Sequence, residues 1–243
     1  MNEFIKKYYK IIIFIQLISF LIIVFGFCEL WNKGNYTTKL LNKLGVKNDK
    51  TVNGDYYALV SWQTSLESMK YDADAVFLGD SITRGGDWQD KFPNLKICNI
   101  GYSGDTINGL INRLNMVKAV NPEKVFILIG VNDIKMGQSK ESYINSYREL
   151  LNGLLEYKPT LHIYVESILP TRKPEDLNND KIIEFNNAIK DMLKSYNDIN
   201  YIDLYPSFCD KNGELISDYT SGGLHLNSDG YNNFYNCIKE YVK

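Results

Sequence analysis

The chain has 243 residues and a formal net charge of −2, and it has no basic stripe with interleaved aromatic side chains. This composition argues against a polyanionic partner, so we do not expect nucleic acid to bind. The four cysteines, Cys28, Cys98, Cys209 and Cys237, show none of the paired C-x-x-C spacings of metal sites. We therefore expect neither a metal nor an organic cofactor.

The N-terminal segment has the features of a membrane anchor. Residues 1–10 contain three lysines, and the stretch 11–27 is apolar except at three positions. Seventeen residues rise about 26 Å in a helix, close to the hydrocarbon thickness of a bilayer. The positive-inside rule then predicts residues 1–10 in the cytoplasm, a transmembrane signal anchor at 11–28 and the remainder outside the cytoplasm.

A cleaved signal peptide is the alternative, and it would leave a secreted protein. The residues around Cys28 lack the small-x-small pattern of a cleavage site, and Phe27 is too large for the position before a lipoprotein cysteine. We therefore expect a single-pass protein of the cell membrane. Export would also permit a disulfide between Cys209 and Cys237.

The remaining chain divides into a linker and one domain. Residues 29–54, rich in Asn, Lys, Thr and Gly, are predicted to form a stalk that holds a short amphipathic helix around 38–44. The segment 55–243 has a length suited to a single domain with a substantial core.

Strand and helix patterns alternate through this domain. Apolar runs predict strands at 75–78, 95–98, 124–129, 162–167 and 201–204. Ser139 is predicted to cap a helix with the apolar face Tyr143, Tyr147, Leu150, Leu151 and Leu154. A later helix is predicted to bury Ile182, Phe185, Ile189 and Met192. The alternation predicts an α/β fold, a single three-layer α/β/α domain with a parallel sheet of five strands.

Three turns that follow predicted strands carry residues able to act on a ligand. Gly79-Asp80-Ser81-Ile82 follows the first strand, Gly104 precedes a helix after the second, and Asn132 follows the third. Ligands of parallel sheets bind beyond the carboxyl ends of the strands, so we expect Ser81, Gly104 and Asn132 to face one site. Taken alone, Ser81 would be explained as a helix cap.

Other residues near these turns have ordinary explanations. Asp80 and Asp133 are expected to anchor local backbone rather than to titrate in catalysis. Arg84, Trp88 and Tyr102 fit a substrate pocket, but their spacing fits surface or core positions equally well.

The chain has only two histidines. His162 lies in a strand pattern and is expected to be a packed or edge residue. His225 lies near the C-terminus, just before the last predicted helix. If a serine–histidine pair exists, His225 is its base.

Ser81, Gly104, Asn132 and His225, in this order, resemble the SGNH (GDSL-type) family of serine esterases and lipases. The resemblance covers the chain from about Tyr57 to the C-terminus and implies a flavodoxin-like strand order, 2-1-3-4-5. It implies Ser81 as nucleophile and His225 as general base. It also implies an oxyanion hole formed by the backbone N–H groups of Ser81 and Gly104 and the side-chain amide of Asn132.

One position departs from the family pattern. The family places an Asp three residues before the His, and this chain has Gly222 there. Three explanations are open: a backbone carbonyl near Ser221 or Gly222 orients the imidazole of a working dyad, Asp218 or Asp229 substitutes for the acid, or catalysis is weak or lost.

These features predict an extracytoplasmic serine esterase that hydrolyses carboxylic esters through an acyl-enzyme. The expected substrates are short acyl (acetyl) esters on glycans, or acyl esters of lysophospholipid type. The alternatives are a non-catalytic binding protein for acylated glycans and an acyltransferase. The membrane is expected to be a partner only through the N-terminal helix.

Overall fold

The computed structural model describes residues 62–63, 65–67, 72–174 and 177–243. The predicted cytoplasmic segment, anchor and stalk lie outside the described residues, so their predictions stay predictions. In the described ranges no helix combines the length and the apolar character that crossing a bilayer requires.

The described chain forms one parallel sheet. Its strands are β1 (Ala75–Gly79), β2 (Ile97–Gly101), β3 (Lys124–Leu128), β4 (His162–Glu166) and β5 (Ile199–Ile202). They lie in the order β2-β1-β3-β4-β5, and every neighbouring pair is parallel. The five-stranded parallel sheet and its predicted strand order are therefore confirmed.

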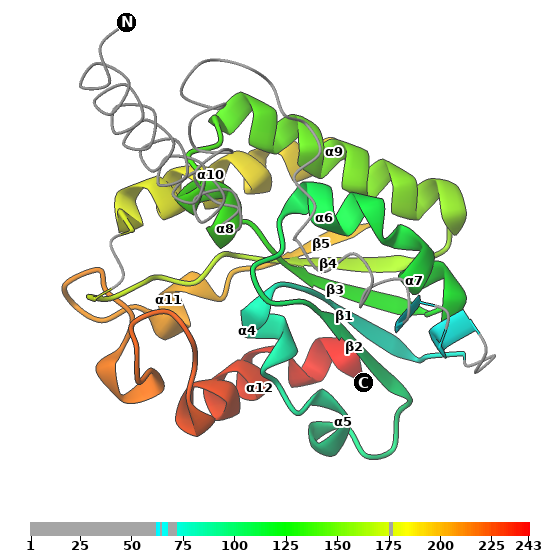
Figure 1. Ribbon diagram of the computed structural model, residues 1–243, viewed down its shortest axis with the longest axis horizontal. Coiled ribbons are helices and arrows are strands. Elements are labelled where there is room, and N and C mark those ends of the chain that lie inside the picture. Colours follow the sequence, from blue (N-terminus) through cyan, green and yellow to red (C-terminus); the bar gives the residue numbers. More distant parts are fainter. Residues whose placement is uncertain (1–61, 64, 68–71, 175–176) are drawn as a thin grey trace, which may run out of the picture. The chain divides into compact units, whose positions relative to one another are not determined.

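Helices cover both faces of the sheet, which confirms the three-layer arrangement (Figure 1). One face carries α6 (Ile107–Asn112), α7 (Leu114–Ala119), α8 (Val131–Lys135), α9 (Lys140–Tyr157) and α10 (Asn179–Leu193). The other carries α5 (Trp88–Lys91), α11 (Tyr205–Phe208) and α12 (Ser228–Val242). The short α4 (Ser81–Arg84) follows β1, and a 3₁₀ turn, η1 (Ser217–Tyr219), precedes α12.

The two long helices behave as predicted. The Ser139 side chain accepts a hydrogen bond from the Ser142 backbone N–H and caps α9. The predicted apolar faces of α9 and α10 are buried. Burial of these faces against the sheet supplies most of their helical stability, because isolated helices of this length are marginal in water.

Aromatic side chains connect the central strands on the α5–α12 face. The register places Phe77 of β1 beside Phe126 of β3, and Phe126 beside Tyr164 of β4. Their rings stack with centroid distances of 5.1 and 4.6 Å, and Trp88 of α5 stacks on Phe77 at 4.4 Å. Trp88 is thus a core residue.

Two strands begin and end away from their predicted bounds. β2 begins two residues later than predicted and extends to Gly101, because its backbone pairs with β1 from Ala75 opposite Ile97 to Gly79 opposite Gly101. β5 lies earlier than predicted, since Leu204 already begins the turn into α11. Cys209 and Cys237 are free thiols in the structure, so the disulfide between them is absent.

Candidate active site

Ser81 and His225 lie within hydrogen-bonding distance, 2.9 Å between Ser81 Oγ and His225 Nε2. Ser81 opens α4 directly after β1, whereas His225 belongs to the loop between η1 and α12. The pair borders an open pocket of about 410 Å³, lined by Ser81, Arg84, Gly85, Ser103, His225, Leu226 and Tyr231. The tertiary structure therefore brings together two residues that are 144 positions apart.

The turn that carries Ser81 is fixed from several sides. The Asp80 carboxylate accepts a hydrogen bond from the Ile82 backbone N–H at 2.9 Å and caps α4. The Tyr231 hydroxyl donates to the Ile82 carbonyl at 2.7 Å, and Arg113 donates to the Gly79 carbonyl at 3.1 Å. These bonds hold the backbone on both sides of Ser81.

The predicted oxyanion-hole residues come from the neighbouring turns. Gly104, at φ +76°, lies in the exposed turn between β2 and α6, and Asn132 is the second residue of α8. The Asn132 Nδ2 donates to the Asp105 carbonyl at 2.8 Å, which ties the Asn132 amide to the turn that holds Gly104. An amide nitrogen has a second N–H, so the side chain retains a donor for a ligand oxygen.

Three buried carboxyl groups lie beneath these turns. Asp105 pairs with Arg113 at 2.7 Å, and Asp133 accepts from the Ile107 backbone N–H at 3.3 Å. Burial raises the pKa of Asp80 and that of Asp133 to about 7 each. Asp80 and Asp133 anchor local backbone, as predicted, and their raised pKa values keep them partly protonated near neutral pH.

The loop around Gly222 has no carboxylate against the imidazole. The Thr220 hydroxyl donates to the His225 carbonyl at 2.7 Å and accepts from the Gly223 N–H at 2.9 Å, so it holds the loop that carries His225. Within the described part of the chain, the second ring nitrogen of His225 has no hydrogen-bond partner.

The two predicted substitute acids lie elsewhere. Asp218 is exposed, and its carboxylate accepts from the Ser217 hydroxyl at 3.1 Å. Asp229 is exposed in the first turn of α12. Among the described residues, His225 contacts neither carboxylate, and no backbone carbonyl near Ser221 or Gly222 accepts a hydrogen bond from its ring, so neither predicted way of orienting the imidazole is present.

Three supporting residues escaped the sequence analysis. Arg113 and Tyr231 bond to backbone carbonyls of other elements, and no local pattern marks such long-range contacts. Thr220 had a usable signal, because a threonine hydroxyl two or three residues before glycines often closes a turn. His162 is exposed at the first residue of β4, at the opposite edge of the sheet from the strand ends that carry the site.

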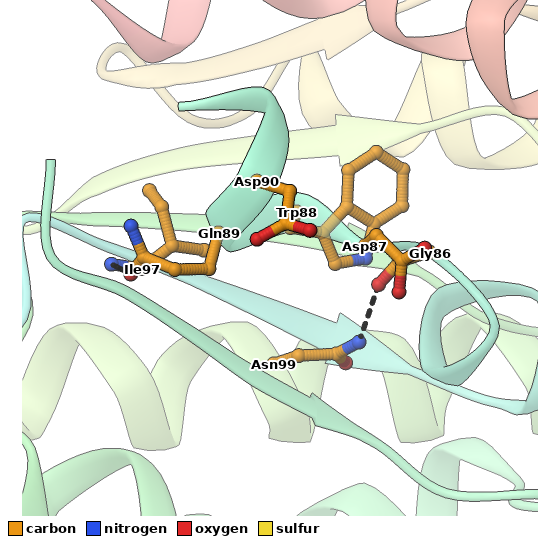
Figure 2. A pocket seen from close by; sticks show the side chains of 7 residues that line it. All are labelled: Gly86, Asp87, Trp88, Gln89, Asp90, Ile97 and Asn99. Carbon is orange, nitrogen blue, oxygen red and sulfur yellow. Dashed lines mark hydrogen bonds between the residues drawn. The ribbon is translucent and has the colours of Figure 1, made fainter. Parts of the chain in front are cut away.

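A second pocket, of about 230 Å³, lies between α5 and the edge strand β2 (Figure 2). Two of its polar side chains bond to backbone carbonyls of the protein. Asn99 Nδ2 donates to the Gly86 carbonyl at 3.1 Å, and Gln89 Nε2 donates to the Leu95 carbonyl at 2.8 Å. The Asn99 bond therefore braces the turn after α4.

Glu166, at the end of β4, is a buried acid outside the site, and one of its oxygens has no partner in the described chain. Burial raises its pKa from 4.5 to about 8. The folded state holds this proton more tightly than the unfolded state, so stability falls as the pH rises from 4.5 towards 8, at roughly 1.4 kcal/mol per pH unit.

We therefore expect Glu166→Gln to raise the free energy of unfolding at pH 8 and to change it little at pH 4.5. The amide cannot ionise, so the share of the pH-dependent loss due to Glu166 disappears. Urea unfolding of both proteins from pH 4.5 to 9 checks this result. The loss of stability due to ionisation of Asp80 and Asp133 is common to the two proteins. Parallel curves for the two proteins would contradict the prediction.

A serine and a histidine in contact at the carboxyl ends of a parallel sheet define the class, the α/β serine hydrolases. Residues 77–232, more than half of the chain, match the model of the GDSL-like lipase/acylhydrolase family. The chain belongs to this family of ester-hydrolysing enzymes, which confirms the resemblance.

The chain is also similar to individual known proteins. The chain is 27% identical over 158 residues to the N-acylneuraminate cytidylyltransferase of Streptococcus agalactiae serotype V, a match of 65% of this chain and 36% of that protein. It is 23% identical over 173 residues to the platelet-activating factor acetylhydrolase IB subunit alpha2 of Homo sapiens, 68% of this chain and 74% of that protein.

Among solved structures, a Streptococcus pneumonia protein provisionally assigned as a platelet activating factor superposes with a TM-score of 0.70 at 25% identity. That alignment covers 76% of this chain and 92% of the other. The chain spans little more than a third of the length of the N-acylneuraminate cytidylyltransferase that it matches.

Proposed function

We propose that the chain is a membrane-anchored, extracytoplasmic serine esterase that removes short acyl groups, acetyl above all, from a hydroxylated substrate such as a glycan. The observation that carries this proposal is the 2.9 Å contact between Ser81 Oγ and His225 Nε2 at the mouth of an open pocket. The anchor and the location rest on the N-terminal sequence pattern alone.

The proposed reaction uses these groups in sequence. Ser81 Oγ attacks the ester carbonyl carbon while His225 Nε2 takes the hydroxyl proton. The oxyanion accepts hydrogen bonds from the N–H groups of Ser81 and Gly104 and from Asn132 Nδ2. Collapse releases the alcohol with the proton from His225, and water activated by His225 then cleaves the acyl-enzyme to a carboxylic acid.

Two features support a short acyl group and water as the acceptor. The turns that follow β1, β2 and β3 are short, and Leu226 is the one large aliphatic residue among the described residues that line the pocket at Ser81. His225 is exposed, so water has access to the acyl-enzyme, which favours hydrolysis over acyl transfer. An acetylhydrolase among the relatives is consistent with an acetyl substrate.

Hydrolysis of p-nitrophenyl esters of increasing chain length by the full-length chain tests the proposal. We expect the highest kcat/KM with acetate and a decline as the acyl chain lengthens, because the described residues that line the pocket at Ser81 are mostly polar. A maximum at eight or more carbons would instead indicate lysophospholipid-like substrates. No turnover at any length would favour a binding protein or an acyltransferase.

A further inference from the structure

Arg84 is the cation of the pocket that contains Ser81 and His225. It ends the helix that Ser81 begins, and residues three apart on a helix lie about 5–6 Å apart at their Cβ atoms. The residues that line this pocket include no aspartate or glutamate. A substrate bound at Ser81 therefore lies within reach of one guanidinium group and of no competing lining carboxylate.

The Arg84 backbone is held in place from the second pocket. Asn99 Nδ2 donates to the carbonyls of Thr83, Arg84 and Gly86 at 3.1, 3.2 and 3.1 Å (Figure 2 shows the bond to Gly86). Gly101 packs against the same turn, where an added Cβ would lie 2.2 Å from the Arg84 nitrogen. The backbone of the turn that carries the Arg84 side chain is thus held by several contacts.

The Arg84 side chain lies beside the turn that follows β2. Its guanidinium carbon lies 5.9 Å from the centre of the Tyr102 ring, and Nη1 lies 3.4 Å from Ser103 Oγ. Both residues precede Gly104, so the guanidinium is directed along the turn that would stabilise the oxyanion. No described carboxylate forms an ion pair with Arg84, whereas Arg113 and Arg172 are both paired.

We propose that Arg84 binds an anionic group on the alcohol part of the substrate, so that the enzyme prefers O-acyl esters that carry a carboxylate or a phosphate. This inference rests on the proposed esterase function and names its substrate class. A guanidinium matches either anion with two parallel hydrogen bonds, which makes it selective for charge and for geometry.

The test compares three acetyl esters: para-acetoxybenzoate, para-acetoxyphenyl phosphate and the neutral methyl para-acetoxybenzoate. For the preferred anion, we expect the kcat/KM ratio of anionic to neutral ester to fall at least about tenfold in Arg84→Gln, mainly through KM. Arg84→Lys should lose less, since it keeps the charge and loses the bidentate geometry. The two anionic esters distinguish a carboxylate from a phosphate.

Arg148→Gln is the matched control, because Arg148 is exposed on α9 and lies outside the pocket. This variant should leave the ratio at its wild-type value. Equal ratios in wild type and Arg84→Gln for both anions would overturn the proposal for Arg84, and hydrolysis of the neutral ester would still support the esterase.

Binding without turnover provides a second readout. The affinity of para-acetoxybenzoate and of para-acetoxyphenyl phosphate is measured on Ser81→Ala and on Ser81→Ala/Arg84→Gln. A dissociation constant raised about tenfold for either anion in the double variant supports the anion site, and equal constants for both overturn it. This measurement decides the role of Arg84 even when no ester is hydrolysed and the proposed function fails.

Discussion

Replacing Ser81 by alanine is expected to lower kcat for p-nitrophenyl acetate by about 10²-fold, to the level of the remaining donors, because a site without the triad acid already starts about 10⁴-fold below a complete triad. Alanine removes the hydroxyl that lies 2.9 Å from His225 Nε2 and leaves the backbone of the turn intact. In the proposed mechanism the backbone N–H groups and Asn132 still polarise the ester, so a residual acceleration of about 10³–10⁴ over water is expected. KM should change far less than kcat.

Initial rates with p-nitrophenyl acetate, before and after the substitution, measure this effect. Ser207→Ala serves as the control, because Ser207 is an exposed serine on α11 and does not line the pocket. A fluorophosphonate probe should label Ser81 in the wild type, with the modified residue identified by mass spectrometry. Ser81→Ala with wild-type turnover would place the nucleophile elsewhere.

Replacing Gly222 by aspartate is expected to raise kcat by at least about tenfold, towards the roughly 10⁴-fold effect of the acid in a complete triad. A Cβ at Gly222 meets no atom within 4 Å, and Gly222 is not among the glycines with positive φ, so the side chain is accommodated without strain. The new carboxylate would occupy the position of the family acid, where it can fix the imidazole tautomer.

Gly222→Asn is the matched control, because it has the same shape and no charge. It should show little of the gain, since a neutral amide does not stabilise the imidazolium. Steady-state kinetics of the three proteins give the comparison. A sharp loss of activity in Gly222→Asp would contradict a working dyad, because an enzyme that lacks the acid should tolerate or profit from its return.

Local sequence patterns predicted much of the fold. The apolar runs that became β1, β3 and β4 mark buried central strands, and α9 and α10 bury the faces that their 3.6-residue spacing predicts. Prediction was less accurate at the edge strands. The apolar segment before Asn99 predicted that β2 begins at residue 95. In the structure, the Gln89 and Asn99 side chains bond to backbone groups at this edge strand, and the apolar pattern does not reveal such contacts.

The candidate site was predictable only as a set of separate turns. Ser81, Gly104 and Asn132 follow strands, and parallel strands place their carboxyl ends at one edge of a sheet. The histidine count then selected His225. The sequence could not separate Arg84, which lines the pocket, from Trp88, which is buried in the core, because both positions fit either environment.

The sequence by itself determined which segments are strands and helices, where the reactive residue types follow strands, and that the family acid is replaced by Gly222. These properties depend on side-chain periodicity and residue identity within a few positions of the chain. Only the tertiary structure decided that Ser81 meets His225 at 2.9 Å, that Thr220 holds the histidine loop and that Arg84 faces the same pocket. Such distances depend on how the β1–α4 turn packs against the loop before α12, and no local pattern encodes that packing.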